Sequence, residues 1–139
     1  MEFIVEGNPQ GKARPRYSSK SGTVYTPSKT KRYEQAIRKA FTDKLYEELE
    51  DYDPDGYISI KVSAYFPIPK SWNKAKKAGA LAGDIYPTSK PDIDNILKAV
   101  LDGLNGVAYE DDKQVVRIVA TKRYAEHGFL NIEIGDFIG

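Results

Sequence analysis

The sequence predicts an α+β fold in which helices cover one small, mixed β-sheet. Two spacings of hydrophobic residues support this fold class. Residues 57–66 alternate between apolar and polar side chains, as a half-buried strand does, whereas residues 92–105 carry an unbroken apolar stripe with helical spacing. With 139 residues, of which 40% are hydrophobic, the chain is long enough for one core, and residues 1–139 are interpreted as a single domain.

The first part of the chain combines a short strand, a polar loop and a helix. Residues 2–6 are β-prone, and residues 9–29 are rich in Pro, Gly, Ser and basic residues, which favours an exposed, mobile loop with a hairpin arm near Ser21 and Gly22. After Ser28, which is a suitable N-cap, apolar residues recur at every fourth position, as in a helix. These residues are Tyr33, Ile37, Phe41 and Leu45.

Two more helices and three strands are expected after this first helix. Two prolines end the alternating strand, and residues 70–81, which are rich in Lys and Ala, predict a short helix on the surface. The helix over residues 92–105 should end at Gly106, a suitable C-cap. Residues 114–124 and 129–135 predict two strands, most simply a hairpin. The expected order of elements is therefore β-α-β-α-α-β-β.

The charges are distributed unevenly, although the net charge is only +1. Residues 1–40 contain nine Lys and Arg against three Glu, and an acidic run over residues 47–55 follows the first helix. A local excess of basic residues is typical of phosphate binding, although the first loop can also be a solvated arm that only aids solubility. The candidates for phosphate contacts are Lys12, Arg14, Arg16, Lys29, Lys31 and Arg32.

Other parts of the chain carry weaker signals. A second basic cluster surrounds Trp72 and is interpreted as a solvated helix face, with phosphate binding as the alternative; its lysines are Lys70, Lys74, Lys76 and Lys77. His127, the only histidine, is assigned to the surface. The chain has no cysteine, which excludes disulfides and thiolate sites, and it shows neither a signal peptide nor a membrane span. We therefore expect a cytoplasmic protein.

Acidic residues gather around the best predicted helix. Asp94, Lys98 and Asp102 are spaced i, i+4, i+8, so they form one ridge opposite the apolar stripe. Asp92 follows a proline and is a natural N-cap, and the positive end of the helix dipole favours anions there. Asp111 and the residue after it follow the helix, and their loop can fold back to either end of it.

Such a cluster is chemically sufficient for metal-assisted phosphodiester hydrolysis. Mg²⁺ prefers oxygen ligands, usually one or two carboxylates together with water and substrate phosphate, and a nearby lysine can stabilise the negative transition state. The alternative is structural. Asp92 can serve only as a cap, the helix pairs can be surface pairs that contribute about 0.2–0.5 kcal/mol each, and Asp111-Asp112 can be a turn.

The pattern of these residues resembles the signature of the RusA-type Holliday junction resolvases. The matching block is Asp92-x-Asp94-Asn95-x-x-Lys98-x-x-x-Asp102-x-Leu104-x-Gly106, followed by Asp111-Asp112-x-Gln114-Val115. The segment Gly7-x-Pro9-x-x-Lys12-x-Arg14-Pro15-Arg16 and the later Tyr25-Thr26-Pro27 are also similar to members of that family, although less specifically. The resemblance therefore covers nearly the whole chain.

This resemblance implies an enzyme. Members of the family are Mg²⁺-dependent endonucleases, often encoded by prophages, that act as homodimers on four-way DNA junctions and make paired symmetric nicks in recombination and repair. Mn²⁺ is an expected substitute for Mg²⁺. Residue by residue, Asp92, Asp94 and Asp112 match the catalytic, metal-binding acids, and Lys98 matches the catalytic lysine. The roles of Glu110 and Asp111 stay open.

Two other functions are consistent with the same residues. One is a junction- or single-strand-binding protein without catalysis, which would bind DNA in a salt-sensitive manner and yield no product. The other is a small phosphatase or nucleotide hydrolase that uses the same acids. The long basic segment argues against the latter, because a small substrate does not need so many phosphate contacts.

Overall fold

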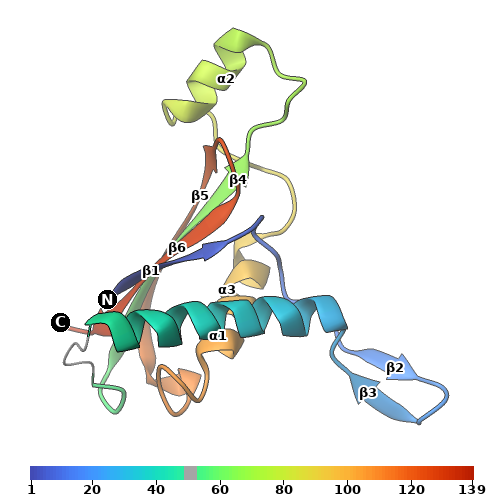
Figure 1. Ribbon diagram of the computed structural model, residues 1–139, viewed down its shortest axis with the longest axis vertical. Helices are drawn as coiled ribbons and strands as arrows, with labels where there is room; N and C mark the ends of the chain where they lie inside the picture. The colour runs from blue at the N-terminus through green and yellow to red at the C-terminus, as the bar shows by residue number, and fades with distance from the viewer. Residues whose placement is uncertain (49–52) are drawn as a thin grey trace.

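The protein is built around a four-stranded sheet with two helices packed on one of its faces (Figure 1). The structure, a computed structural model, describes residues 1–48 and 53–139. The order along the chain is β1 (Glu2–Glu6), β2 (Arg16–Ser18), β3 (Thr23–Tyr25), α1 (Ser28–Glu48), β4 (Ile58–Pro67), α2 (Lys74–Leu81), α3 (Ile93–Leu104), a 3-10 turn (Asp112–Gln114), β5 (Val115–Ala125) and β6 (Phe129–Asp136). The predicted α+β class is confirmed.

The sheet is mixed, as predicted, with the strand order β1-β6-β4-β5. β6 runs antiparallel to both β1 and β4, whereas β5 runs parallel to β4. The apolar positions of neighbouring strands coincide in this register: Ile60 of β4 lies between Ile118 of β5 and Ile134 of β6. α2 and α3 form the connection between β4 and β5, because two parallel strands need a long crossover.

The predicted hairpin of the last two strands is wrong, because β4 lies between them. The three residues that join them pass across the end of β4, since Ala125 is opposite Pro67 and Phe129 is opposite Tyr65. Crossing two strand spacings requires about 10 Å, which a loop of this length can span. A loop this short can join two neighbouring strands or two strands that flank a third one. The loop length alone therefore does not predict a hairpin.

Nearly all buried hydrophobic side chains of the described residues form one cluster between the sheet and the helices. Tyr33, Ile37 and Phe41 of α1 are buried in it, as their spacing predicts. Gly103 of α3 allows the two helices to approach closely, because a Cβ atom there would lie 3.0 Å from the Glu34 carbonyl oxygen and 3.1 Å from Ile37 Cβ. The helix that carries the acidic ridge is therefore fixed directly against α1.

Most predicted elements are present, with shifts at their ends. The hairpin arm in the first loop is confirmed as β2–β3, which turns at Gly22 with a φ of +68° and projects beyond the start of α1 (Figure 1). α1 begins at Ser28 itself, and α2 begins at Lys74, where the Asn73 side chain accepts the Lys76 N–H at 2.8 Å. Part of the acidic run, residues 49–52, lies outside the described residues.

Two predictions about the surface can also be checked. His127 is exposed, with its ring nitrogen 3.8 Å from a Glu6 carboxylate oxygen, as its assignment to the surface predicts. Trp72 packs edge-on against Tyr124 with 5.1 Å between the ring centres, and Lys76 lies 4.0 Å above the Trp72 ring. Among the helices described, none combines the length and apolar character needed to cross a membrane.

Candidate active site

Two of the predicted catalytic acids lie at the start of α3. Asp92 occupies the N-cap position with extended backbone angles, as predicted, but its side chain makes no capping hydrogen bond. Asp94 lies in the first helical turn, and both carboxylates are exposed. The peptide dipoles of the helix favour negative charge at this end, and the oxygens of the Asp92 side chain are not used for capping.

The ridge predicted along α3 is present. In the described part of the chain, its charges do not form the i,i+4 surface pairs of Lys98 that the structural alternative assumes. Lys98 and Asp102 are both exposed on the helix. Within the described residues, neither Asp94 nor Asp102 forms an ion pair with Lys98; instead Asp102 Oδ2 lies 3.0 Å from Lys12 Nζ. Lys98 therefore leaves its positive charge available to a ligand on the ridge.

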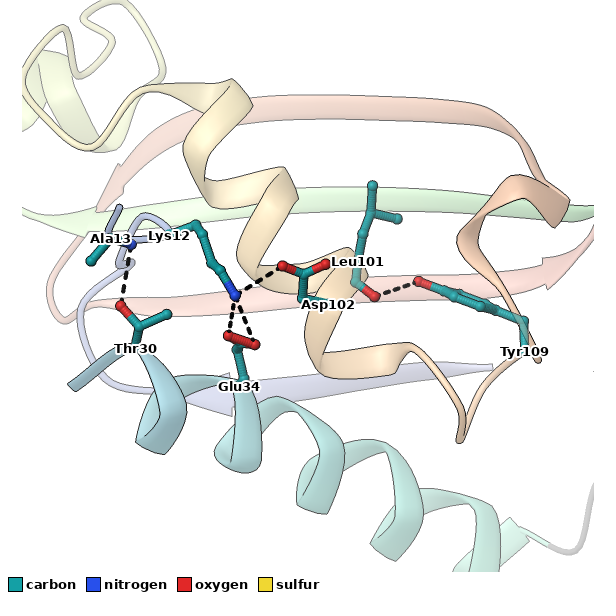
Figure 2. Close-up of polar contacts among 7 residues, drawn as sticks. All are labelled: Lys12, Ala13, Thr30, Glu34, Leu101, Asp102 and Tyr109. Carbon is teal, nitrogen blue, oxygen red and sulfur yellow. Dashed lines mark hydrogen bonds and ion pairs between the residues drawn. The ribbon is translucent and has the colours of Figure 1, made fainter. Parts of the chain in front are cut away.

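The Asp111-Asp112 turn folds back toward the end of α3, which the sequence did not decide. Gly106 N–H donates to Tyr109 O at 2.8 Å, and the Tyr109 hydroxyl donates to Leu101 O at 2.8 Å (Figure 2). The Gln114 amide then donates to Pro54 O at 2.7 Å, which ties the turn to the segment before β4. The turn therefore lies next to the C-terminal half of α3.

The two acids of this turn have different environments. Asp111 caps the 3-10 turn by accepting the Lys113 N–H at 2.9 Å, and this hydrogen bond lowers the pKa of Asp111. Partial removal from water, followed by the neighbouring Asp111 carboxylate and the charge of Asp102, raises the pKa of Asp112. The Asp111 carboxylate is therefore engaged in a hydrogen bond to the backbone, whereas the surroundings of Asp112 disfavour its ionised form.

The three predicted metal ligands do not form one coordinating group. Asp94 and Asp102 are separated by two helical turns, about 12 Å along the axis, and Asp112 lies on the Asp102 side. The described residues contain no group of three or more His, Cys, Asp or Glu side chains arranged to hold a metal ion. The pair at the start of α3 still fits Mg²⁺ by its chemistry, because this ion commonly uses one or two carboxylates together with substrate phosphate.

Lys12 differs from the other predicted DNA contacts. Figure 2 shows its ammonium group between α1 and α3, where Nζ lies 2.7 Å from Glu34 Oε1 and 3.0 Å from Asp102 Oδ2. Burial acts to lower the pKa of Lys12, but the hydrogen bonds and charges of Glu34 and Asp102 outweigh it, and the pKa is raised. Lys12 is therefore a charged group that the protein itself neutralises.

The remaining predicted DNA contacts are exposed. They lie at the base of the β2–β3 arm, on the arm itself and at the start of α1: Arg14, Arg16, Lys29, Lys31 and Arg32. A cleft of about 390 Å³ lies between the arm and the loop before α3, and its lining includes Arg16, Lys29, Lys90 and Pro91. Pro91 immediately precedes Asp92, so the lining of this basic cleft ends one residue before the first of the exposed carboxylates. A larger groove of about 510 Å³ lies between β1 and α1 and is lined by none of the predicted site residues.

Sequence reasoning missed Lys90 as part of the cleft and Glu34 as the partner of Lys12. A signal existed for Glu34, because it is the single acid among the basic residues that open α1. Lys90 was visible only as a neighbour of the acidic motif, and the cleft forms because the first loop packs against that motif. Gly11 marks this contact, since a Cβ atom there would lie 2.9 Å from Asn95 Cβ and 3.1 Å from Pro91 Cβ.

Comparisons with known proteins agree with the motif. Residues 6–135 match the family model described as "Endodeoxyribonuclease RusA". The chain is also 36% identical to the "Uncharacterized protein YqaN" of Bacillus subtilis (strain 168) over 138 residues, which cover 96% of this chain and 94% of that relative. The match to the family includes the acidic ridge, the Asp111-Asp112 turn and the basic arm.

Proposed function

Because the chain belongs to the RusA endodeoxyribonuclease family, we propose that it is a Mg²⁺-dependent endonuclease that cuts four-way DNA junctions in recombination and repair. The observation that carries this proposal is the pair of free carboxylates, Asp92 and Asp94, next to a basic cleft. Exposed acids repel DNA unless a cation lies between them and the phosphates, so their position next to phosphate-binding residues favours a metal site.

The acids and the lysine have separate roles in this proposal. Asp92 and Asp94 hold Mg²⁺, with Mn²⁺ as a substitute, and Lys98 neutralises charge on the phosphate from the ridge. When bound, the metal ion supplies an activated water and neutralises charge at phosphorus. Asp112 is proposed as the third acid because it matches the family motif and because, unlike Asp111, it does not cap the turn.

The DNA backbone is proposed to follow the basic cleft and the arm. Arg14 and Arg16 contact phosphates from the base and the first strand of the arm, and Lys29, Lys31 and Arg32 contact them from the start of α1. Such contacts do not depend on sequence, so selectivity for a junction would come from its shape. Tyr17 on the arm is 67% exposed and can pack on sugars or unstacked bases.

The proposal includes a homodimer and a cytoplasmic location. A four-way junction has twofold symmetry, and two symmetric nicks need two sets of carboxylates, which two copies of this chain supply. The chain carries a single acidic motif. A prophage origin stays a prediction from the resemblance.

A gel assay with a synthetic four-way junction and a matched linear duplex, each with and without Mg²⁺, tests this function. We expect paired nicks in the junction only, and only with the metal ion. Phosphate release from mononucleotides with the junction left intact would indicate a small-molecule hydrolase instead.

The separation of Asp112 from Asp94 favours one alternative, a junction- or single-strand-binding protein without catalysis. That function predicts salt-sensitive binding and no product with Mg²⁺ or Mn²⁺. The same assay therefore distinguishes the two functions.

A further inference from the structure

Lys12 lies at the base of the β2–β3 arm but is not part of its exposed basic surface. Its side chain is 22% exposed, and its ammonium group contacts Glu34, which is 17% exposed, and Asp102, which is 45% exposed. A phosphate contact by Lys12 would require it to leave both carboxylates, and two uncompensated negative charges would then face the DNA. An ammonium group that already neutralises two acids is therefore poorly suited to bind phosphate.

The residues next to Lys12 join the same two helices. Lys12 N–H donates to Asn95 O of α3 at 3.0 Å, and Ala13 N–H donates to Thr30 Oγ1 of α1 at 3.2 Å (Figure 2). Gly11 packs against Asn95 and Pro91. Residues 11–13 thus contact α1, α3 and the segment before Asp92, and the arm begins three residues later at Arg16.

We propose that Lys12 is a positioning residue: through its ion pairs with Glu34 and Asp102, it fixes the base of the β2–β3 arm against α3, so that DNA held by the arm meets the carboxylates at the start of that helix. The ion pairs join helices that are far apart in sequence, and Asn95 follows Asp94 directly. The consequence for cleavage rests on the proposed nuclease function, whereas the fixation of the arm does not.

The decisive experiment compares Lys12→Met with Arg14→Met, a matched loss of one positive charge two residues away. Arg14→Met should weaken junction binding and reduce the slope of log K against log salt by about 1. Lys12→Met should leave the salt slope unchanged and lower the saturated cleavage rate by about tenfold, because a misplaced strand reacts more slowly.

Amide hydrogen exchange of the free protein gives a measurement that does not depend on cleavage. Lys12→Met should accelerate exchange at the base of the arm, at Lys12–Arg16, by about tenfold, and leave the amides of β4 unchanged. Lys12→Arg, which keeps the charge, should largely restore protection and cleavage. In the Glu34→Gln background, Lys12→Met should have a smaller effect, because one of its two partners is already neutral.

Several results would overturn the proposal. A salt slope that falls in Lys12→Met as it does in Arg14→Met, with normal exchange at the base of the arm, would make Lys12 a phosphate contact. Faster exchange throughout the chain, not restored by Lys12→Arg, would make it a residue of general stability. If the wild-type protein cuts no junction, the nuclease proposal fails, while the exchange experiment still decides whether Lys12 fixes the arm.

Discussion

The two ends of α3 use aspartate in opposite ways. At the N-terminal end, Asp92 makes no capping bond and both Asp92 and Asp94 are exposed beside a basic cleft. At the C-terminal end, Asp102 pairs with Lys12 and Asp111 caps a turn, whereas the pKa of Asp112 is raised by its removal from water and by the neighbouring Asp111. Asp102 and Asp111 therefore have partners within the protein, whereas the described residues form neither an ion pair nor a capping hydrogen bond with Asp92 or Asp94. Acids left unsatisfied where DNA can reach them are the better candidates for a metal ion.

The largest expected effect concerns the free acids. Asp94→Asn should lower junction cleavage by about a thousandfold while junction affinity stays equal or rises, because one negative charge facing the phosphates is removed. Single-turnover cleavage and a separate binding assay in Ca²⁺ or EDTA measure the two properties. Asp84→Asn removes the same charge from an exposed loop and should leave both unchanged. Cleavage by Asp94→Asn at the wild-type rate would remove this residue from the mechanism.

The arm and the acids should separate binding from catalysis. Arg14→Gln combined with Arg16→Gln should weaken junction affinity by about tenfold and reduce its salt slope by about 2, with little change in the saturated cleavage rate. Fluorescence anisotropy over a salt series measures this, and Lys39→Gln on the far part of α1 is a suitable control. Equal losses of affinity from arginine and aspartate variants would contradict this division of roles.

The close contact of α3 with α1 predicts a loss of stability. Gly103→Ala should cost about 1–3 kcal/mol of unfolding free energy, because its Cβ atom would press on the Glu34 carbonyl and on Ile37. Gly135→Ala is the matched control, since a Cβ atom there meets nothing within 4 Å, and it should be neutral or slightly stabilising. Urea unfolding compares the two variants, and equal stability of both would contradict the close packing of α3 against α1 at Gly103.

The smallest expected effects are pH-dependent and opposite for the two neighbouring acids. The pKa of Asp111 is lowered by its cap, so Asp111→Ala should destabilise the protein at neutral pH, and this loss should vanish as the pH falls below about 4. The pKa of Asp112 is raised, so the folded state resists its ionisation. Asp112→Asn should therefore stabilise the protein slightly at neutral pH and not below about pH 4, although we expect it to lower cleavage.

Thermal unfolding from pH 3 to 8 would show both trends. Stability changes of the same sign for the two variants would contradict the assignment of Asp111 as the cap and of Asp112 as the acid whose ionised form is disfavoured in the folded state.

The sequence predicted the local features of this protein better than its long-range ones. The stripe of α3, the alternation of β4 and the β2–β3 hairpin all depend on spacing within one segment. The partner of β6 was predicted wrongly, because β4 alternates in the same way whichever strands flank it.

The site shows the same limit. The ridge of α3 followed from the i, i+4, i+8 spacing, but the end of the helix that Asp112 approaches depends on the bonds of Tyr109 and Gln114 to distant backbone groups. The position of Lys12 depends on Glu34 and on Asp102, which is 90 residues away in the chain. The sequence therefore showed Lys12 as one of several basic residues, but it did not show that Glu34 and Asp102 neutralise its charge.

The most direct test of the central claim is to locate the divalent ion. Mn²⁺ titrated into the labelled protein should broaden the backbone amide signals around Asp92 and Asp94 first, and the double variant Asp92→Asn, Asp94→Asn should abolish this broadening. Broadening centred on Asp102 and Asp112, and unchanged in that variant, would show that the metal ion binds at the other end of α3 and would contradict this account.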